Sequence, residues 1–156
     1  MFTHAIARLP GEDFANGITT SNLGKPDYEL ILTQHQAYLA ALQSLGVTLT
    51  VLDPLPGFPD AYFVEDAAVV TPEVAIITRP GAAARRGEEQ TIAEALSKLL
   101  PIMPIVAPGT LEGGDVMLAE RHFYIGLSER TNEEGARQLG TIMEKYGYTW
   151  TTIPVP

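Results

Sequence analysis

The chain contains 156 residues, 46% of them hydrophobic, carries a formal net charge of −9 at pH 7 and has no cysteine. This length supports a buried core and favours a single domain, and no apolar run approaches the roughly 18 residues of a membrane span. The absent cysteines exclude disulfides, thiolate metal sites and a cysteine nucleophile within these residues, while the negative charge argues against nucleic acids and anionic membranes as partners.

The N-terminal segment predicts a strand, a loop, a helix and a second strand. Its first residues lack the basic and long apolar regions of a secretory signal, so we expect a cytoplasmic protein. A strand at 4–9 enters a loop at 10–25, and Pro26 is expected at an early position of the following helix, where its missing N–H is harmless. Apolar side chains at helical spacing continue to a stop at Gly46, and residues 47–52 alternate as a strand.

Residues 58–66 combine three carboxylates, Asp60, Glu65 and Asp66, with aromatic and aliphatic neighbours. A solvated acidic loop has no need of such neighbours, and an unpaired buried carboxylate is costly. We therefore interpret the segment as the floor of a pocket for a cation, and a guanidinium, with its planar fork, suits paired carboxylates. The alternative is that Glu65 and Asp66 only cap a turn where a strand begins.

The remaining residues contain a repeat of acid, hairpin, arginine loop, helix and strand. The first copy comprises strands at 67–70 and 74–78, a helix at 88–100 and a strand at 102–106. The second comprises strands at 116–119 and 123–126, a helix at 132–146 and a strand at 149–155. Asp66 corresponds to Asp115, and Arg85 to Arg130. Repeats of this length are typical of arrays or radially arranged modules.

The N-terminal segment resembles an incomplete copy of the same unit, so the chain holds about two and a half units. We expect one partial α/β domain over 1–156, with approximate modules at 1–58, 59–108 and 109–156. Because each copy carries its acid and its arginine at the same point, a radial arrangement would gather these groups around one centre.

Several motifs occur in an order and spacing that match a known family. They are Ile18 to Ser21, Leu23 to Tyr28, Phe58-Pro59-Asp60, Phe63 to Asp66, Ile76 to Gly81 with Arg85-Arg86, Leu111 to Asp115, and Phe123 to Gly126 with Ser128, Arg130, Thr131 and Asn132. With these motifs, essentially the whole chain resembles the dimethylarginine dimethylaminohydrolases.

The resemblance implies the pentein fold, in which five ββαβ modules form an α/β propeller around a channel. It also implies a hydrolase that converts Nω-methylated arginine to citrulline and methylamine or dimethylamine, without cofactor or metal, through a thiouronium intermediate on a cysteine. The family's cysteine and its histidine acid–base lie downstream of the matching region. We therefore expect two and a half to three of five modules here, and an inactive isolated chain. His4, His35 and His122 match no catalytic position.

The resemblance also assigns the acidic residues. Glu65 and Asp66 match positions that hold the substrate guanidinium, and Asp66 is thereby placed among the catalytic residues. Neighbours on a regular strand point to opposite faces, so both can reach one ligand only if the backbone bends there. Glu112 matches the carboxylate that orients the catalytic histidine, before two glycines that allow close backbone approach. The role of Asp115 is left open.

The remaining matches concern the amino-acid end of the substrate. Asp60 and the backbone carbonyl of Ile18, on a loop that moves, match the α-amino site. Arg85 and Arg130 match positions that hold the carboxylate, a task suited to guanidinium forks. Arg86 is expected at the surface, because only one of two neighbours needs to point inward.

Two other functions stay open. The same pair of carboxylates, Glu65 and Asp66, would also bind the guanidinium in an arginine or agmatine deiminase or an amidinotransferase, and the degree of substrate methylation is not fixed by the sequence. A different class is a non-catalytic binding or assembly module, because an isolated partial propeller would expose module edges and invite self-association.

Overall fold

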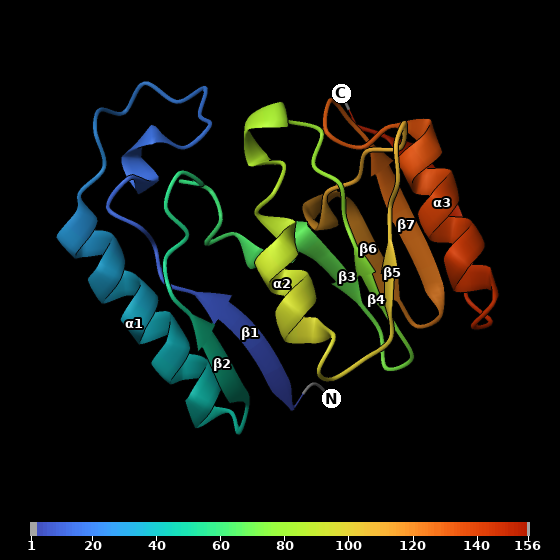
Figure 1. Cartoon of the computed structure of the whole chain (residues 1–156), viewed down its shortest axis with the longest axis horizontal. Helices are drawn as coiled ribbons and strands as arrows, with labels where there is room; N and C mark the ends of the chain where they lie inside the picture. The colour runs from blue at the N-terminus through green and yellow to red at the C-terminus, as the bar shows by residue number, and fades with distance from the viewer. Residues whose placement is uncertain (1–2, 156) are drawn as a thin grey trace. The chain divides into compact units, whose positions relative to one another are not determined.

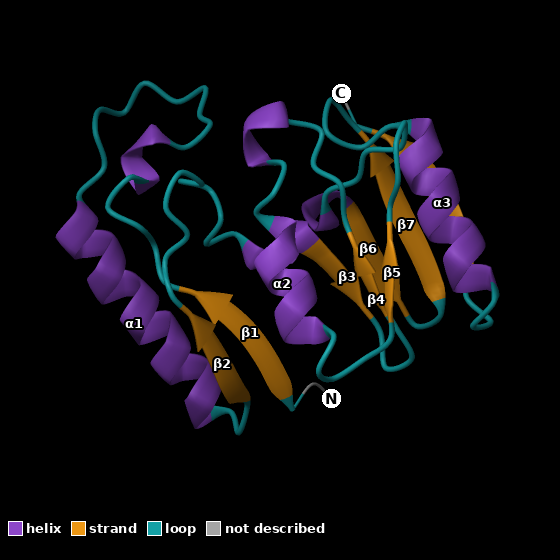
Figure 2. Cartoon of the chain, in the orientation of Figure 1, coloured by secondary structure: helices purple, strands orange, loops and turns teal. Residues whose placement is uncertain are grey.

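The computed structural model describes residues 3–155, and its elements follow the α/β order expected from the sequence (Figures 1 and 2). The chain divides into two compact units, Met1–Val64 and Glu65–Pro156. None of the helices within the described residues is both long and apolar enough to cross a bilayer.

The first unit is a βαβ crossover. Strand β1 (His4–Arg8) pairs in parallel with β2 (Thr48–Leu52), and helix α1 (Tyr28–Ser44) connects them. The position predicted for Pro26 is wrong by a small margin, since the helix is capped by the Asp27 carboxylate, which accepts a hydrogen bond from the Leu30 amide at 3.0 Å. Pro26 therefore precedes the cap. The predicted stop is confirmed at Gly46, whose φ of 82° suits glycine.

The second unit repeats one ββαβ pattern twice. In the first copy, β3 (Ala68–Val70) is antiparallel to β4 (Ala75–Ile77), and helix α2 (Glu89–Leu96) leads to β5 (Ile102–Pro104), parallel to β4. In the second copy, β6 (Val116–Ala119) is antiparallel to β7 (His122–Leu127), and helix α3 (Glu133–Glu144) leads to β8 (Thr149–Pro154), parallel to β7. The predicted order of elements is confirmed in both copies, while the module boundaries stay a prediction.

Both acid positions of the repeat lie on short 3-10 helices before the hairpins. Glu65 and Asp66 belong to the turn Val64–Ala67, and Asp115 ends the turn Gly113–Asp115. The expectation of a strand beginning at residue 67 was therefore wrong by one residue. The Thr78 hydroxyl, which donates to the Asp66 carbonyl at 2.7 Å, fixes this turn beside β4.

One hydrophobic core unites the two copies of the second unit. It includes Ile76 from β4, Leu111 from the connecting loop, Ile125 from β7 and Leu139 from α3, each fully or almost fully buried. An antiparallel bridge between Arg79 and Leu111 joins the copies. Burial on this scale is the main favourable term in folding, and it supplies a rigid base for the loops that carry the polar residues.

Candidate functional site

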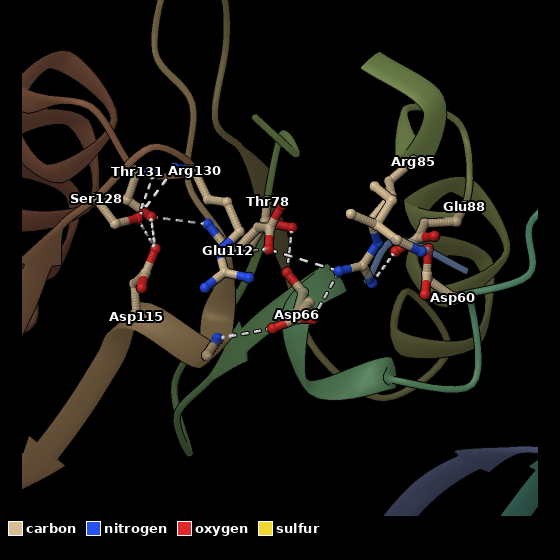
Figure 3. A network of polar contacts seen from close by, with 12 residues as sticks. Asp60, Asp66, Thr78, Arg85, Glu88, Glu112, Asp115, Ser128, Arg130 and Thr131 are labelled. Atoms are coloured by element: carbon tan, nitrogen blue, oxygen red, sulfur yellow. Dashed lines mark hydrogen bonds and ion pairs between the residues drawn. The ribbon is translucent and has the colours of Figure 1, made fainter. Parts of the chain in front are cut away.

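The predicted acid pair lies on a tight turn rather than on a strand. Glu65 is exposed and, within the described residues, its carboxylate makes no hydrogen bond or ion pair. Asp66 is half-buried, and its two oxygens accept from the Arg85 Nη1 at 2.8 Å and from the Gly114 amide at 3.0 Å (Figure 3). The argument that neighbouring strand residues face opposite ways does not apply to this turn. That Glu65 and Asp66 both point toward one ligand stays a prediction.

The two glycines after Glu112 permit a close approach of backbone segments, as expected. A Cβ on Gly113 would lie 1.9 Å from the Glu65 backbone oxygen, and one on Gly114 would lie 2.7 Å from the Asp66 carboxylate. A side chain at position 113 would push the turn of Glu112 away from the Glu65 backbone, and one at position 114 would displace the Asp66 carboxylate.

Arg85 is buried among carboxylates. Its guanidinium lies 2.8 Å from Asp66, 2.5 Å from Glu88 and 3.5 Å from Glu112. Burial lowers the pKa of Arg85, but hydrogen bonds to Glu88 and Asp66 outweigh it, so the pKa is raised and the cation is permanent. Arg86 is exposed and donates to the backbone oxygens of Pro80 and Gly81, which confirms it as the surface member of the pair.

Glu88 is a residue of this cluster that the sequence reasoning missed. It is only 2% exposed, and it binds the Arg85 guanidinium from the beginning of α2. Its position three residues after Arg85 was a usable signal, because such neighbours meet when the backbone is helical.

Glu112 is 2% exposed, and its two carboxylate oxygens lie in different surroundings. One, Oε2, lies 3.5 Å from the Arg85 Nη1 and 3.6 Å from the Arg130 Nε. The other, Oε1, is buried and, within the described part of the chain, has no hydrogen-bond partner. Burial raises the pKa of Glu112; Arg85 and Arg130 oppose this effect, and the charges of Asp66 and Asp115 add to it. A buried acceptor of this kind suits a strong N–H donor.

Arg130 differs from Arg85 in exposure. Its side chain is 62% exposed, and its only ion pair among the described residues is the 3.6 Å contact with Glu112. The second unit thus brings together Asp66, Glu112 and both predicted arginines (Figure 3). Carboxylates outnumber the two cations, which favours a cationic ligand, while the exposed Arg130 can accept an anionic group.

The first unit contains the other two predicted residues. The Ile18 amide donates to the Asp60 Oδ2 at 3.0 Å, and a Cβ on Gly17 would lie 2.4 Å from the Asp60 Oδ1. Both residues line a cavity of about 620 Å³ between the loop that precedes α1 and α1 itself. The sequence anticipated the Ile18 carbonyl as the functional group, but in this structure the contact with Asp60 comes from its amide.

The arrangement can bind and orient a charged ligand but contains no thiolate nucleophile, since the chain has no cysteine. No group of three or more potential metal ligands occurs within residues 3–155.

Comparison with known proteins identifies the family. The family described as "N,N dimethylarginine dimethylhydrolase, eukaryotic" matches residues 16–155. The chain belongs to the dimethylarginine dimethylaminohydrolase family. It is 50% identical to the N(G),N(G)-dimethylarginine dimethylaminohydrolase of Pseudomonas aeruginosa over 155 residues, which cover 98% of the chain and 61% of that relative. The enzyme of the same name from Streptomyces coelicolor is 40% identical, with 97% and 59% covered. The chain thus spans about three fifths of the length of these relatives.

Solved structures agree with the dimethylarginine dimethylaminohydrolase assignment. A Pseudomonas aeruginosa family member in complex with citrulline superposes with a TM-score of 0.98 at 49% identity, covering 100% of this chain and 62% of that one. The N-terminal domain of the cyanobacterial arginine dihydrolase ArgZ superposes with a TM-score of 0.85 at 14% identity, covering 98% and 58%, and so shares the fold. The family and the pentein-like α/β fold predicted from the sequence are thereby confirmed. The roles assigned to individual residues stay predictions.

Proposed function

We propose that this chain forms the substrate-binding part of a hydrolase that converts Nω-methylated arginine to citrulline and methylamine or dimethylamine. Membership of the dimethylarginine dimethylaminohydrolase family supports the reaction class. The observation that carries the proposal is Glu112, a buried carboxylate whose Oε1 has no partner among the described residues.

In this proposal the two ends of the substrate meet different groups. Glu65 and Asp66 bind the guanidinium, since two carboxylates compensate the desolvation of a permanent cation. Arg130, with Arg85 beside it, receives the carboxylate, and Asp60 with Ile18 serves the α-amino group. Arg85 keeps its charge among Asp66 and Glu88, so it offsets the acids that surround it.

The chemical step needs a cysteine, which this chain does not contain, and a histidine at a catalytic position that none of its three histidines matches. A cysteine thiolate attacks the guanidinium carbon, the amine leaves with a proton from a histidine, and water then releases citrulline from the thiouronium and restores the thiolate. The Glu112 Oε1 accepts the imidazole N–H and stabilises the imidazolium, as the acid of a triad does. The 156 residues alone, with no cysteine, therefore bind substrate without turnover, as part of an incomplete propeller of two and a half to three modules.

The experiment is a calorimetric titration of the purified chain with monomethylarginine, dimethylarginine, arginine, agmatine and citrulline. We expect the methylated arginines to bind more tightly than agmatine, which lacks the carboxylate, and we expect no citrulline to form. A preference for unmethylated arginine or agmatine would instead support a deiminase. Absence of binding by all of them would support a non-catalytic module, and citrulline formation by the chain alone would refute the assignment of the nucleophile.

A further inference from the structure

Asp115 holds the short loop that carries Arg130. Its Oδ2 accepts the Ser128 hydroxyl at 2.7 Å and the Thr131 hydroxyl at 2.6 Å (Figure 3). The Ser128 hydroxyl oxygen in turn accepts the backbone amides of Arg130 at 3.0 Å and Thr131 at 3.2 Å. One carboxylate thus fixes both ends of the loop through hydrogen bonds assisted by its charge.

The same network reaches Glu112. The Thr131 hydroxyl oxygen accepts the Glu112 amide at 3.1 Å, and the Asp115 amide donates to the Glu112 carbonyl at 3.1 Å. Thr131 is completely buried, so these bonds are shielded from water. The backbone of Glu112 and the loop of Arg130 are therefore tied to one anchor.

Asp115 in the second copy of the repeat corresponds to Asp66 in the first copy. Asp66 occupies the equivalent place in the first copy and binds its own arginine directly, through the Arg85 Nη1 at 2.8 Å. Asp115 instead holds the backbone around Arg130 through two hydroxyls. Asp66 neutralises its arginine side chain, whereas Asp115 positions an arginine whose side chain stays 62% exposed.

We propose that Asp115 is a positioning residue that sets Arg130 for the carboxylate of the ligand and holds the backbone of Glu112. The inference rests on the proposed function for the identity of the ligand, but the anchoring itself does not. Preorganisation matters here because an exposed arginine side chain loses conformational freedom when it binds.

The test compares two ligands on three variants of the chain. Asp115→Ala removes the acceptor, Asp115→Asn keeps one oxygen in place, and Glu129→Gln removes a neighbouring exposed charge as a matched control. Titration uses monomethylarginine and its decarboxylated analogue. We expect Asp115→Ala to bind monomethylarginine about tenfold more weakly, the size of one lost charge-assisted hydrogen bond. The analogue should bind unchanged, with Asp115→Asn intermediate and Glu129→Gln equal to the parent chain.

A second measurement needs no ligand. In native-state hydrogen exchange, Asp115→Ala should speed exchange at the amides of Glu112, Arg130 and Thr131 and leave the amides of α2 unchanged. Faster exchange everywhere, or equal loss of both ligands, would mean a general structural role and overturn the proposal. If the parent chain binds neither ligand, the proposed function fails, while the exchange pattern still decides whether Asp115 anchors the loop. If Asp115→Ala does not fold, Asp115→Asn carries both measurements.

Discussion

At the scale of single residues, Glu112 combines features that stability alone does not favour. Its carboxylate is almost fully buried, two arginines lie on one side of it, and the other oxygen lacks a partner within the described residues. An unsatisfied buried acceptor costs free energy. Such local costs concentrate at functional sites, which agrees with a carboxylate prepared for a histidine N–H.

The pH dependence of stability should reveal this cost. Burial raises the pKa of Glu112 above its ordinary 4.5. In the pH window between the ordinary pKa and the raised one, the folded state therefore binds a proton more tightly than the unfolded state. The free energy of unfolding must then fall as pH rises through the window. Glu112→Gln, which cannot ionise, should be more stable than the parent chain at neutral pH, with the difference vanishing below pH 4.5.

Urea unfolding between pH 4 and 7 measures this difference, and Glu134→Gln is the control of opposite sign. Hydrogen bonds from Arg137 and Gln138 lower the pKa of Glu134 to about 2. Its contribution is therefore present above its ordinary pKa of 4.5 and is lost as pH falls, so Glu134→Gln should be slightly less stable at neutral pH. A Glu112→Gln variant that is less stable than the parent at pH 7 would contradict the interpretation of Glu112.

At the scale of elements, α3 depends on a glycine where it passes the connecting loop. A Cβ on Gly135 would lie 1.9 Å from the Thr110 backbone oxygen, and backbone cannot move aside cheaply. Alanine favours helices by about 1 kcal/mol over glycine, yet we expect Gly135→Ala to lose about 1–3 kcal/mol because the site is overpacked. Thr141→Ala, exposed on the same helix, should not destabilise the chain. Thermal denaturation decides, and a stabilised Gly135→Ala would disprove the tight packing.

Local signals in the sequence predicted much of the fold. The stop at Gly46 could be predicted because it acts within a few residues of the helix end. The caps Asp27 and Asn132 act just as locally, but neither was identified as a cap from the sequence. The helix α2 was predicted too long, at 88–100 rather than Glu89–Leu96. The amides of Leu99 and Leu100 both donate to the Leu96 carbonyl, forming a turn before Pro101 that apolar periodicity does not reveal.

The candidate site was less accessible to sequence reasoning. Family resemblance supplied Glu65, Asp66 and Glu112, because their motifs are contiguous. It did not indicate that Arg85 is enclosed by three carboxylates or that Asp115 holds the loop of Arg130. Arg85 and Glu88 lie three residues apart, but the other contacts join residues distant in the chain, so no local pattern encodes those.

At the scale of the whole molecule, an exposed apolar strand edge favours self-association, and a strong negative net charge opposes it. Strand β6 lies at the edge of its sheet, and its Met117 and Leu118 are 58% and 38% exposed. Unpaired edges with apolar side chains invite pairing with another chain. The net charge of −9 works against that contact through repulsion, and salt screens repulsion.

We therefore predict self-association that increases with salt, measured by sedimentation equilibrium at low and high ionic strength. Met117→Lys places a charge on the edge and should reduce association, because two copies paired at β6 would bring like charges together. The same substitution makes the net charge less negative. If overall charge repulsion alone controlled association, Met117→Lys would therefore increase association rather than reduce it. Gln90→Lys, exposed on α2, makes an equal change in charge away from the edge and should not reduce association. A parent chain that stays monomeric at high salt, or a Met117→Lys variant that associates as the parent does, would rule out the β6 edge.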